Sequence, residues 1–176
     1  MTKTCTAIAT VVLLGLLLGV AQAQSARTYR SPDGTLIATV LAKGKSPAGP
    51  KESVVEIRRA GELLARGDYT SDDGEHGLIV EKVAWTSDSQ FFIFMTSSSG
   101  GHQPWQSPAF FFSVADRQVH SFSEYLPAVA EPAFSVKKPD LVTMIIWTPL
   151  NEKRNMTESI MLPITFKMSD LLRPQK

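Results

Sequence analysis

The chain has 176 residues, with 18 lysine and arginine residues against 17 aspartate and glutamate residues, for a formal net charge of +1. This balance argues against nucleic acid or an acidic membrane surface as the main partner, because both select a concentrated basic face. The single cysteine, Cys5, excludes an intrachain disulfide framework.

The first residues have the pattern of an export signal. A lysine precedes the apolar stretch 7–20, and the small residues of 21–23 follow it. The apolar stretch is shorter than the roughly 20 residues of a membrane-spanning helix. We therefore predict a signal peptide over 1–23 and one exported domain over 24–176, with no membrane anchor after cleavage. That domain lacks cysteine, which favours the periplasm as its location.

Short runs rich in β-branched and aromatic residues follow, separated by turn residues. They predict strands over 35–42, 53–59, 77–85, 90–98, 108–114, 118–122, 141–147 and 159–168. Turn chemistry lies between them at 32–34, 59–61, 72–74, 99–101 and 115–117. The polar tract 42–52 predicts an exposed hairpin loop. Helical turns are expected at most in 121–126 and 169–173, because no segment has a sustained helical period.

Three segments share an aromatic residue, a short polar turn with an aspartate, and an apolar strand. They carry Asp33, Asp88 and Asp140 in their turns. The turns recur at about 50 residues, an interval typical of propeller or solenoid repeats. The first copy, with its "SPDG" turn, resembles the blades of WD40-like and TolB-like β-propellers. In those families the turn leads into a strand near the central axis.

The resemblance implies an all-β, mainly antiparallel fold with about three propeller-blade-like repeats in one compact domain. A closed propeller usually has four or more blades. The repeats are therefore expected to form an incomplete ring or a compact assembly of sheets, with an ordinary β-sandwich as the alternative. Alternate strand residues face opposite sides of a sheet, so the phenylalanines are predicted to be core residues rather than a ligand pocket. These are Phe91, Phe94, Phe110 and Phe112.

The residue types of a serine hydrolase occur close together in the sequence. They are Ser97, Ser98, Ser99, His102, Asp88 and Asp116. A catalytic triad needs the serine oxygen beside the histidine and an acid behind that ring. The chain has neither a Gly-x-Ser-x-Gly elbow nor a strand-to-helix transition that would hold a strained nucleophile. We predict no enzyme and no catalytic residue, and we keep a serine-type hydrolase as the alternative function.

The histidines give no pattern of a metal site. They are His76, His102 and His120, and the acids Asp72, Asp73 and Glu75 lie near the first of them. No two histidines have the spacing of metal ligands on one element. The acidic stretch also lacks the alternating ligands of a calcium loop. We therefore predict neither a metal nor a cofactor.

The segment 97–105 lies between two apolar predicted strands and has the composition of a display loop. Gly100 and Gly101 allow backbone angles closed to other residues, and Trp105 offers a large anchor. Contacts of β-proteins are often placed on loops of this kind. The alternative interpretation is a plain connection in which His102 and Trp105 pin the chain to the core while the serines are solvated.

A small, secreted, propeller-like β-domain with a serine-bearing loop resembles the periplasmic immunity proteins that neutralise cell-wall amidases delivered by type VI secretion. In that family a serine loop blocks the active-site cleft of the effector. The resemblance implies a non-enzymatic inhibitor of a peptidoglycan hydrolase or amidase, and a second alternative is an envelope scaffold that completes its sheet by oligomerising. The implied partner-binding residues are Ser97, Ser98, Ser99, Gly100, Gly101, His102, Gln103 and Trp105.

Overall fold

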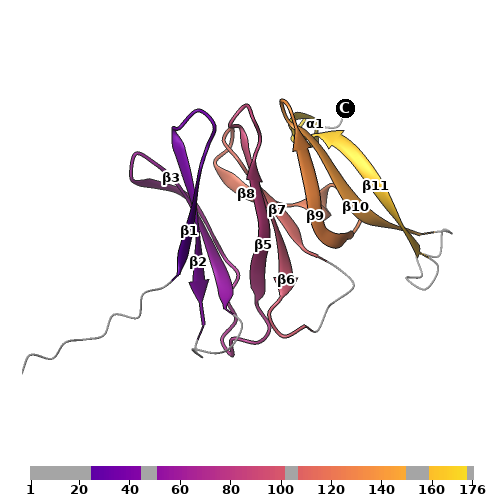
Figure 1. Ribbon diagram of the computed structural model, residues 1–176, viewed down its shortest axis with the longest axis horizontal. Helices are drawn as coiled ribbons and strands as arrows, with labels where there is room; N and C mark the ends of the chain where they lie inside the picture. The colour runs from indigo at the N-terminus through magenta and orange to yellow at the C-terminus, as the bar shows by residue number, and fades with distance from the viewer. Residues whose placement is uncertain (1–24, 45–50, 102–106, 150–158, 174–176) are drawn as a thin grey trace, which may run out of the picture.

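The chain forms three antiparallel β-sheets that stand side by side (Figure 1). The computed structural model describes residues 25–44, 51–101, 107–149 and 159–173. The all-β, mainly antiparallel fold predicted from the sequence is confirmed, including one blade-like sheet for each of the three repeats. The predicted signal peptide 1–23 lies outside the described residues.

Each sheet is a meander in which strands consecutive in the chain are neighbours. The first sheet contains β1 (Ala26–Arg30), β2 (Leu36–Lys43), β3 (Glu52–Arg59) and β4 (Glu62–Asp68). The middle sheet contains β5 (Leu78–Trp85), β6 (Phe91–Ser98), β7 (Ala109–Ser113) and β8 (Gln118–Ser121). The third sheet contains β9 (Val129–Lys137), β10 (Leu141–Pro149) and β11 (Ser159–Lys167). It therefore has one strand fewer than the other two.

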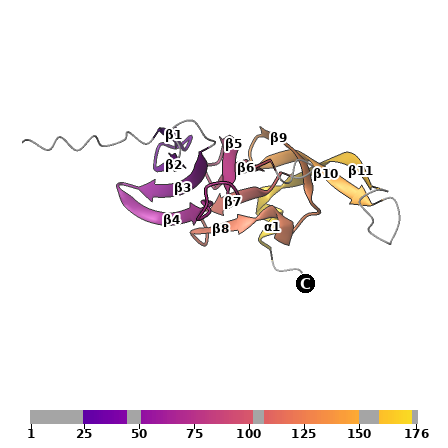
Figure 2. The same ribbon diagram turned by 90° about the horizontal axis from the view of Figure 1, so that it is seen from below.

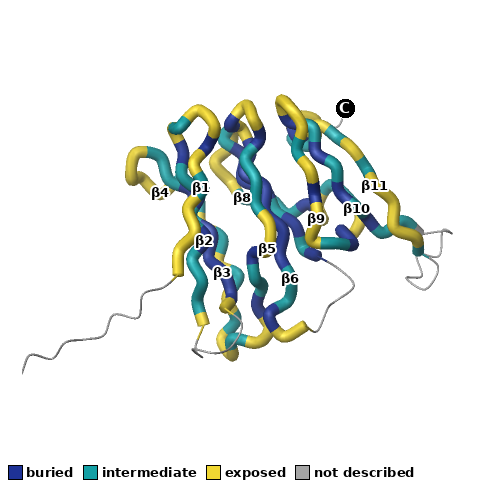
Figure 3. The backbone as a smooth tube through the Cα atoms, viewed as in Figure 1, coloured by how far each residue is buried: buried dark blue, intermediate teal, exposed yellow. Residues whose placement is uncertain are grey.

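The middle sheet is buried on both faces, and this sandwiching creates two cores (Figures 2 and 3). On β6, Phe92 and Phe94 pack towards the first sheet, while Phe91, Ile93 and Met95 pack towards the third. The alternation follows from the two-residue period of a strand. Figure 2 shows the resulting three layers from below.

The predicted phenylalanine core is confirmed, with one difference of degree. Phe91, Phe94 and Phe112 are buried, and the predicted core residue Phe110 is half-buried at the margin of the core against the first sheet. Neighbouring sheets pack face to face, as the two sheets of a β-sandwich do. The two architectures weighed from the sequence therefore share the same local packing.

The three repeated turns occupy equivalent places, each joining the first strand of its sheet to the second. In the first copy, the Ser31 hydroxyl donates to Asp33 (2.6 Å) and accepts from the Leu36 amide (2.9 Å). In the second, the Thr86 hydroxyl donates to Asp88 (2.6 Å) and accepts from the Phe91 amide (3.0 Å). The same side-chain bridge thus closes both turns.

The third turn is shorter and uses its aspartate differently. Lys138 and Pro139 are joined by a cis peptide bond, and Asp140 is buried and accepts from the Ser169 amide (2.9 Å). Ser169 belongs to the short helix α1 (Met168–Leu171), which follows β11. The loose match of the third copy to the sequence pattern therefore corresponds to a real difference in the turn.

The turns also link the sheets to one another. The Asp33 amide donates to the Ser89 hydroxyl (3.0 Å), which connects the first sheet to the middle one. The Ser87 amide donates to the Pro139 carbonyl (3.0 Å), which connects the middle sheet to the third. These bonds join all three repeats at one end of the molecule, which is uppermost in Figure 1.

Three strands, β1, β4 and β9, were not predicted from the sequence. β1 and β4 are edge strands of the first sheet, largely exposed and rich in charged or polar residues, so they lack the apolar runs used to predict strands. β9 contains Pro132, which weakens a strand prediction and is tolerated at a sheet edge. The expected helical turns are present as η1 (Phe122–Glu124) and α1. Within the described residues, no helix has the length and apolar character needed to cross a membrane.

Candidate functional site

The predicted loop begins where β6 ends, at the end of the middle sheet opposite the three linked turns. Ser97 and Ser98 are the last residues of β6 and pair with Ile79 and Leu78 of β5. Gly100 and Gly101 are exposed. Gly101 has a φ of 68°, a value that glycine adopts without strain. The predicted contact residues His102, Gln103 and Trp105 lie outside the described residues.

The serine hydroxyls at the base of the loop bond to carboxylates. Ser97 is half-buried and donates to the Oε1 atom of Glu81 at 2.6 Å. Ser99 is buried, with 9% exposed, and donates to the Oε1 atom of Glu52 at 2.8 Å. The prediction that all three serines contact a partner is not tested by these bonds. They do show that Ser99 serves as an attachment point within the chain.

Glu52 is the centre of that attachment. The residue is 2% exposed, and its carboxylate accepts four hydrogen bonds. Besides the Ser99 hydroxyl, the donors are the Ser71 amide (2.6 Å), the Ser71 hydroxyl (2.8 Å) and the Gly77 amide (2.6 Å). One carboxylate at the start of β3 therefore holds both the connection between β4 and β5 and the loop after β6.

Local sequence makes the close approach to Glu52 possible. A side chain on Gly77 would collide with the Glu52 carboxyl group and with the Tyr69 carbonyl. Gly77 also accepts a backbone bond from the Ser99 amide at 2.9 Å. Glycine at this position thus lets three segments meet around one carboxylate.

The environment of Glu52 favours its charged form. Burial opposes ionisation, but the hydrogen bonds from Ser71, Ser99 and Gly77 outweigh this effect and lower the pKa of the Glu52 carboxyl group below its ordinary value. The ionised carboxylate is the form that accepts all four donors. The base of the loop is therefore held by charge-assisted bonds.

Glu52 was not predicted as a functional residue. The sequence pattern predicted that it ends an exposed hairpin loop over 42–52. That prediction is wrong at both ends, because Ala42 and Lys43 belong to β2 and Glu52 is the buried first residue of β3. Residues 45–50 lie outside the described residues. An acid before an apolar strand gives no local signal of burial, since its partners lie 19 to 47 residues away.

The acids considered for a catalytic triad have other hydrogen-bond partners. Asp88 accepts from Thr86 and from the Gln90 amide within its own turn. Asp116 Oδ2 lies 2.7 Å from His120 Nε2. Burial opposes ionisation of Asp116, but its bonds, chiefly that from His120, lower its pKa. In the part of the chain that the structure describes, neither acid bonds to a serine of the loop.

His120 and His76 each pair with an acid of their own turn region. His120 stacks on Phe111, with ring centroids 5.1 Å apart, and its Nδ1 atom lies 3.3 Å from the Tyr125 hydroxyl. His76 Nδ1 lies 2.5 Å from Asp73 Oδ2. Among the described residues, no group of three or more histidine, cysteine or acidic side chains is arranged to hold a metal ion.

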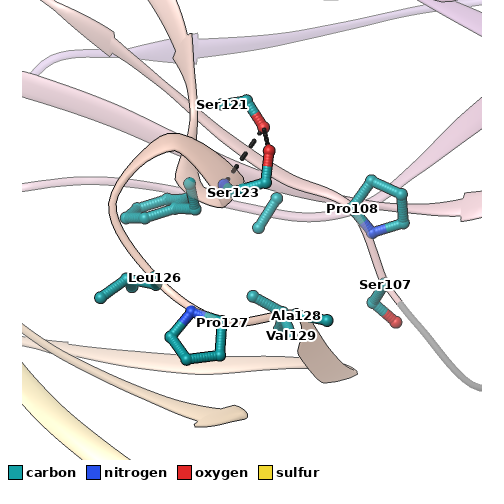
Figure 4. A pocket seen from close by; sticks show the side chains of 10 residues that line it. Ser107, Pro108, Ser121, Ser123, Leu126, Pro127, Ala128 and Val129 are labelled. Carbon is teal, nitrogen blue, oxygen red and sulfur yellow. Dashed lines mark hydrogen bonds between the residues drawn. The ribbon is translucent and has the colours of Figure 1, made fainter. Parts of the chain in front are cut away.

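A hollow of about 310 Å³ lies where the chain re-enters the middle sheet after the loop (Figure 4). Figure 4 shows Ser107 and Pro108 on one side and Pro127, Ala128 and Val129 on another. The Ser107 amide donates to the Val129 carbonyl at 2.9 Å, which fixes this end of the loop to the third sheet. The loop is therefore attached at its start through Glu52 and at its end through Val129.

A scan against protein-family models and a search of the curated proteins find no match to this chain.

Proposed function

We propose that the chain is an exported, non-enzymatic binding protein of the periplasm, and specifically an inhibitor or immunity protein for a cell-wall hydrolase. Its contact surface is the loop over 97–105. Export rests on the signal-like sequence of 1–23. The resemblance to propeller repeats and to immunity proteins belongs to the same proposal.

The observation that carries the proposal is the attachment of the loop at both ends. Ser99 is bonded to a buried carboxylate, and Ser107 is bonded to β9. Between these points the small residues Gly100 and Gly101 are exposed. Ser99 and Ser107 are therefore already fixed before binding, and preorganised residues beside a contact surface favour an inhibitor.

The hydrogen bonds of the serines favour a binder over a hydrolase. A nucleophilic serine donates its proton to a base such as an imidazole. Here the hydroxyls of Ser97 and Ser99 donate directly to Glu81 and Glu52. Ser99 thus contributes as an anchor, and the remaining loop residues are left as the contact surface.

Inhibition of a purified peptidoglycan amidase by the full chain tests the proposal. The variant Gly100→Arg places a large charged side chain at the tip, where glycine is exposed. We expect it to weaken inhibition by about 100-fold, because disruption at the centre of an interface costs several kcal/mol. Ala115→Arg, on the exposed turn between β7 and β8 at the opposite end of the middle sheet, is the matched control.

Two outcomes would overturn the assignment. The first is a chain that inhibits no peptidoglycan hydrolase and retains none from a periplasmic extract. The second is an equal effect of both arginine variants, which would place the contact elsewhere on the molecule. Thermal unfolding of each variant separates loss of binding from loss of folding.

One observation favours a second candidate, an envelope scaffold that completes its sheet by self-association. β11 is the edge of the three-stranded sheet and exposes Ile160, Met161 and Leu162, each at 39–48%. The only charged residue of β11 is Lys167 at its end, and an unpaired edge strand with few charges invites pairing with another strand. Pro163 has no amide hydrogen, so pairing would be confined to the half of β11 before it.

Sizing of the purified chain by light scattering tests this candidate. Self-association through β11 predicts a dimer that Met161→Lys converts to a monomer, because a buried unpaired charge opposes the contact. Leu63→Lys is the matched control, since Leu63 is an equally exposed apolar residue on β4. A monomeric parent chain, or a dimer that survives Met161→Lys, would exclude this mode of assembly.

A further inference from the structure

The third sheet is the last layer of the stack, and its outer face is the one turned away from the middle sheet (Figures 1 and 2). The helical segments η1 and α1 lie on the inner side, because Phe122 and Met168 pack into the core between the middle and third sheets. Among the described residues, no further layer covers the outer face.

The central strand of this sheet, β10, is apolar on both of its faces. Met144 and Ile146 are buried in the core on the inner face. Because successive strand residues point to opposite faces, Ile145 and Trp147 lie on the outer face. A strand with one solvated face alternates apolar and polar residues, whereas a strand covered on both faces is a nearly continuous apolar run. The sequence of β10 therefore has the pattern of a strand covered on both sides.

The strand β6 shows what such a pattern means in this molecule. Its phenylalanines point alternately to both sides, with Phe92 facing the first sheet and Phe91 facing the third. Neighbouring sheets cover it on both faces. The first sheet is also a terminal layer, but the ion pairs of Glu56 with Arg58 and Arg66 lie on its outer face. The third sheet thus has the composition of an inner layer in the position of an outer one.

The edge strand β11 extends the apolar surface of β10. Residues paired across an antiparallel ladder share a face. Met161 pairs with Trp147, and Pro163 pairs with Ile145. Met161 is 48% exposed, Pro163 is exposed, and the two β10 residues are half-buried. These four neighbouring residues form an uncharged apolar surface, which we call the outer patch.

The charges of the outer face lie at one end of the sheet. Lys137 and Lys167 pair with Leu141 from its two sides. Thr143 and Thr165 separate them from the outer patch, and the hydroxyl oxygens of these threonines are 2.8 Å apart. Neither β10 nor β11 contains an acidic residue. A partner on the outer patch therefore meets no carboxylate from these two strands.

We propose that the outer patch is the interface of a symmetric dimer, in which the third sheets of two copies of the chain pack face to face. This contact repeats the packing that already joins neighbouring sheets within the chain. Two-fold symmetry brings the same surface of both copies together, and an uncharged patch allows this without opposing like charges. The first sheet of a second copy is a poorer match, because its ion pairs would lose water against an apolar surface.

The lysines determine which of two orientations we expect. When the strands of the two copies run in the same direction, Lys137 and Lys167 of one copy lie near the same residues of the other. When the strands run in opposite directions, the two lysine ends lie at opposite ends of the interface. Like charges repel, so the dimer has the second orientation.

This contact differs from pairing along the edge of β11. Edge pairing joins the backbone groups of β11 and leaves the side chains of β10 outside the contact. Face packing buries Ile145 on the central strand and leaves out Ile160, which pairs with Thr148 on the inner face. The loop over 97–105 follows β6 of the middle sheet, so dimerisation and inhibition can fail separately.

Sedimentation velocity of the purified exported chain over a concentration series tests the interface. Ile145→Lys and Met161→Lys each place a charge in the outer patch and should raise the dissociation constant of the dimer by about 100-fold. Ile160→Lys is the matched control, because Ile160 adjoins Met161, is 39% exposed and lies on the other face. It should leave the constant unchanged, and thermal unfolding checks that each variant is folded.

Cysteine cross-linking with oxidised glutathione tests the orientation. The predicted exported domain contains no cysteine, so one introduced thiol is unique. Ile145 is at the centre of β10, and Ile145→Cys should give a disulfide-linked dimer. Lys137→Cys should not, because the two copies of this position would be roughly 27 Å apart along the strands. That separation is far beyond the reach of a disulfide.

Three results would overturn the proposal. The first is a parent chain that stays monomeric throughout the concentration series. The second is equal weakening by Met161→Lys and Ile160→Lys without an effect of Ile145→Lys, which is expected for pairing along the edge of β11. The third is cross-linking through Lys137→Cys and not through Ile145→Cys, which would show that the strands do not run in opposite directions.

Discussion

At the scale of single residues, Glu52 joins segments that are distant in the chain, and no local sequence pattern indicates this role. It is a buried acid with four donors from two other segments of the chain. A buried carboxylate is costly unless it is fully hydrogen-bonded. Its stabilising effect therefore depends on Ser71, Gly77 and Ser99 being in place together.

Replacement of this carboxylate should change the pH dependence of stability. Glu52→Gln puts an amide group opposite backbone donors, and we expect it to lower the free energy of unfolding by about 3 kcal/mol at neutral pH. Because the pKa of Glu52 is lowered by folding, its contribution is present above the unfolded value and is lost as pH falls through the folded value. The variant should therefore lose less stability than the parent between about pH 7 and about pH 3.

Urea unfolding at both pH values measures these differences. Ser99→Ala removes one of the four donors and should give a smaller loss, of about 1–2 kcal/mol. Ser98→Ala is the matched control, since no hydrogen bond joins the Ser98 side chain to another residue that the structure describes. Parallel pH profiles of the parent and Glu52→Gln would show that another group governs acid unfolding.

At the scale of elements, β6 is the strand on which both cores depend. Phe92 and Phe94 face the first sheet, and Phe91 faces the third. Phe94 is fully buried and lies 5.4 Å from Phe110 and 5.7 Å from Tyr69, measured between ring centroids. The aromatic rings of the middle sheet thus pack against a largely aliphatic face of the first sheet, which includes Leu36, Val55 and Ile57.

Replacement of a phenylalanine of this cluster by alanine should lower the free energy of unfolding, and the loss should be larger for the more deeply buried side chain. Phe94→Ala is expected to lower the free energy of unfolding by about 3–5 kcal/mol, through lost apolar contact and the cavity left behind. Phe110→Ala, at the half-exposed margin of the same cluster, should cost about half as much. Chemical denaturation measures both, and a loss below about 1 kcal/mol for Phe94→Ala would contradict the double-faced core.

At the scale of the whole molecule, the first and third sheets expose different kinds of side chain. The outer face of the first sheet carries an ion-pair ladder in which Arg66 contacts both Glu56 (3.5 Å) and Asp68 (2.9 Å), and Arg58 contacts Glu56 (3.0 Å). The third sheet ends instead on the apolar edge of β11. The charged outer face of the first sheet is therefore suited to contact with water, whereas the exposed apolar edge of the third sheet is suited to contact with a partner.

Several features could be predicted because they depend on residues close in the chain. The turns around Asp33 and Asp88 are closed by side chains two residues away, and both were predicted from an aromatic residue followed by a short polar turn with an aspartate. The run of phenylalanines in β6 indicated a core strand for a similar reason, since a strand has a fixed two-residue period. β4 was missed because its exposed edge position removes the apolar signal.

The sequence by itself determined the β-rich composition of the fold, its three repeats, the export signal as a prediction, and the position of the candidate loop between two strands. Only the tertiary structure decided that Ser99 is an anchor rather than a free hydroxyl, because Glu52 lies 47 residues earlier in the chain. It likewise decided that Ile145 and Met161 share the outer face of the third sheet. Local patterns record backbone preferences, whereas burial and charge pairing depend on which distant segments meet when the sheets stack.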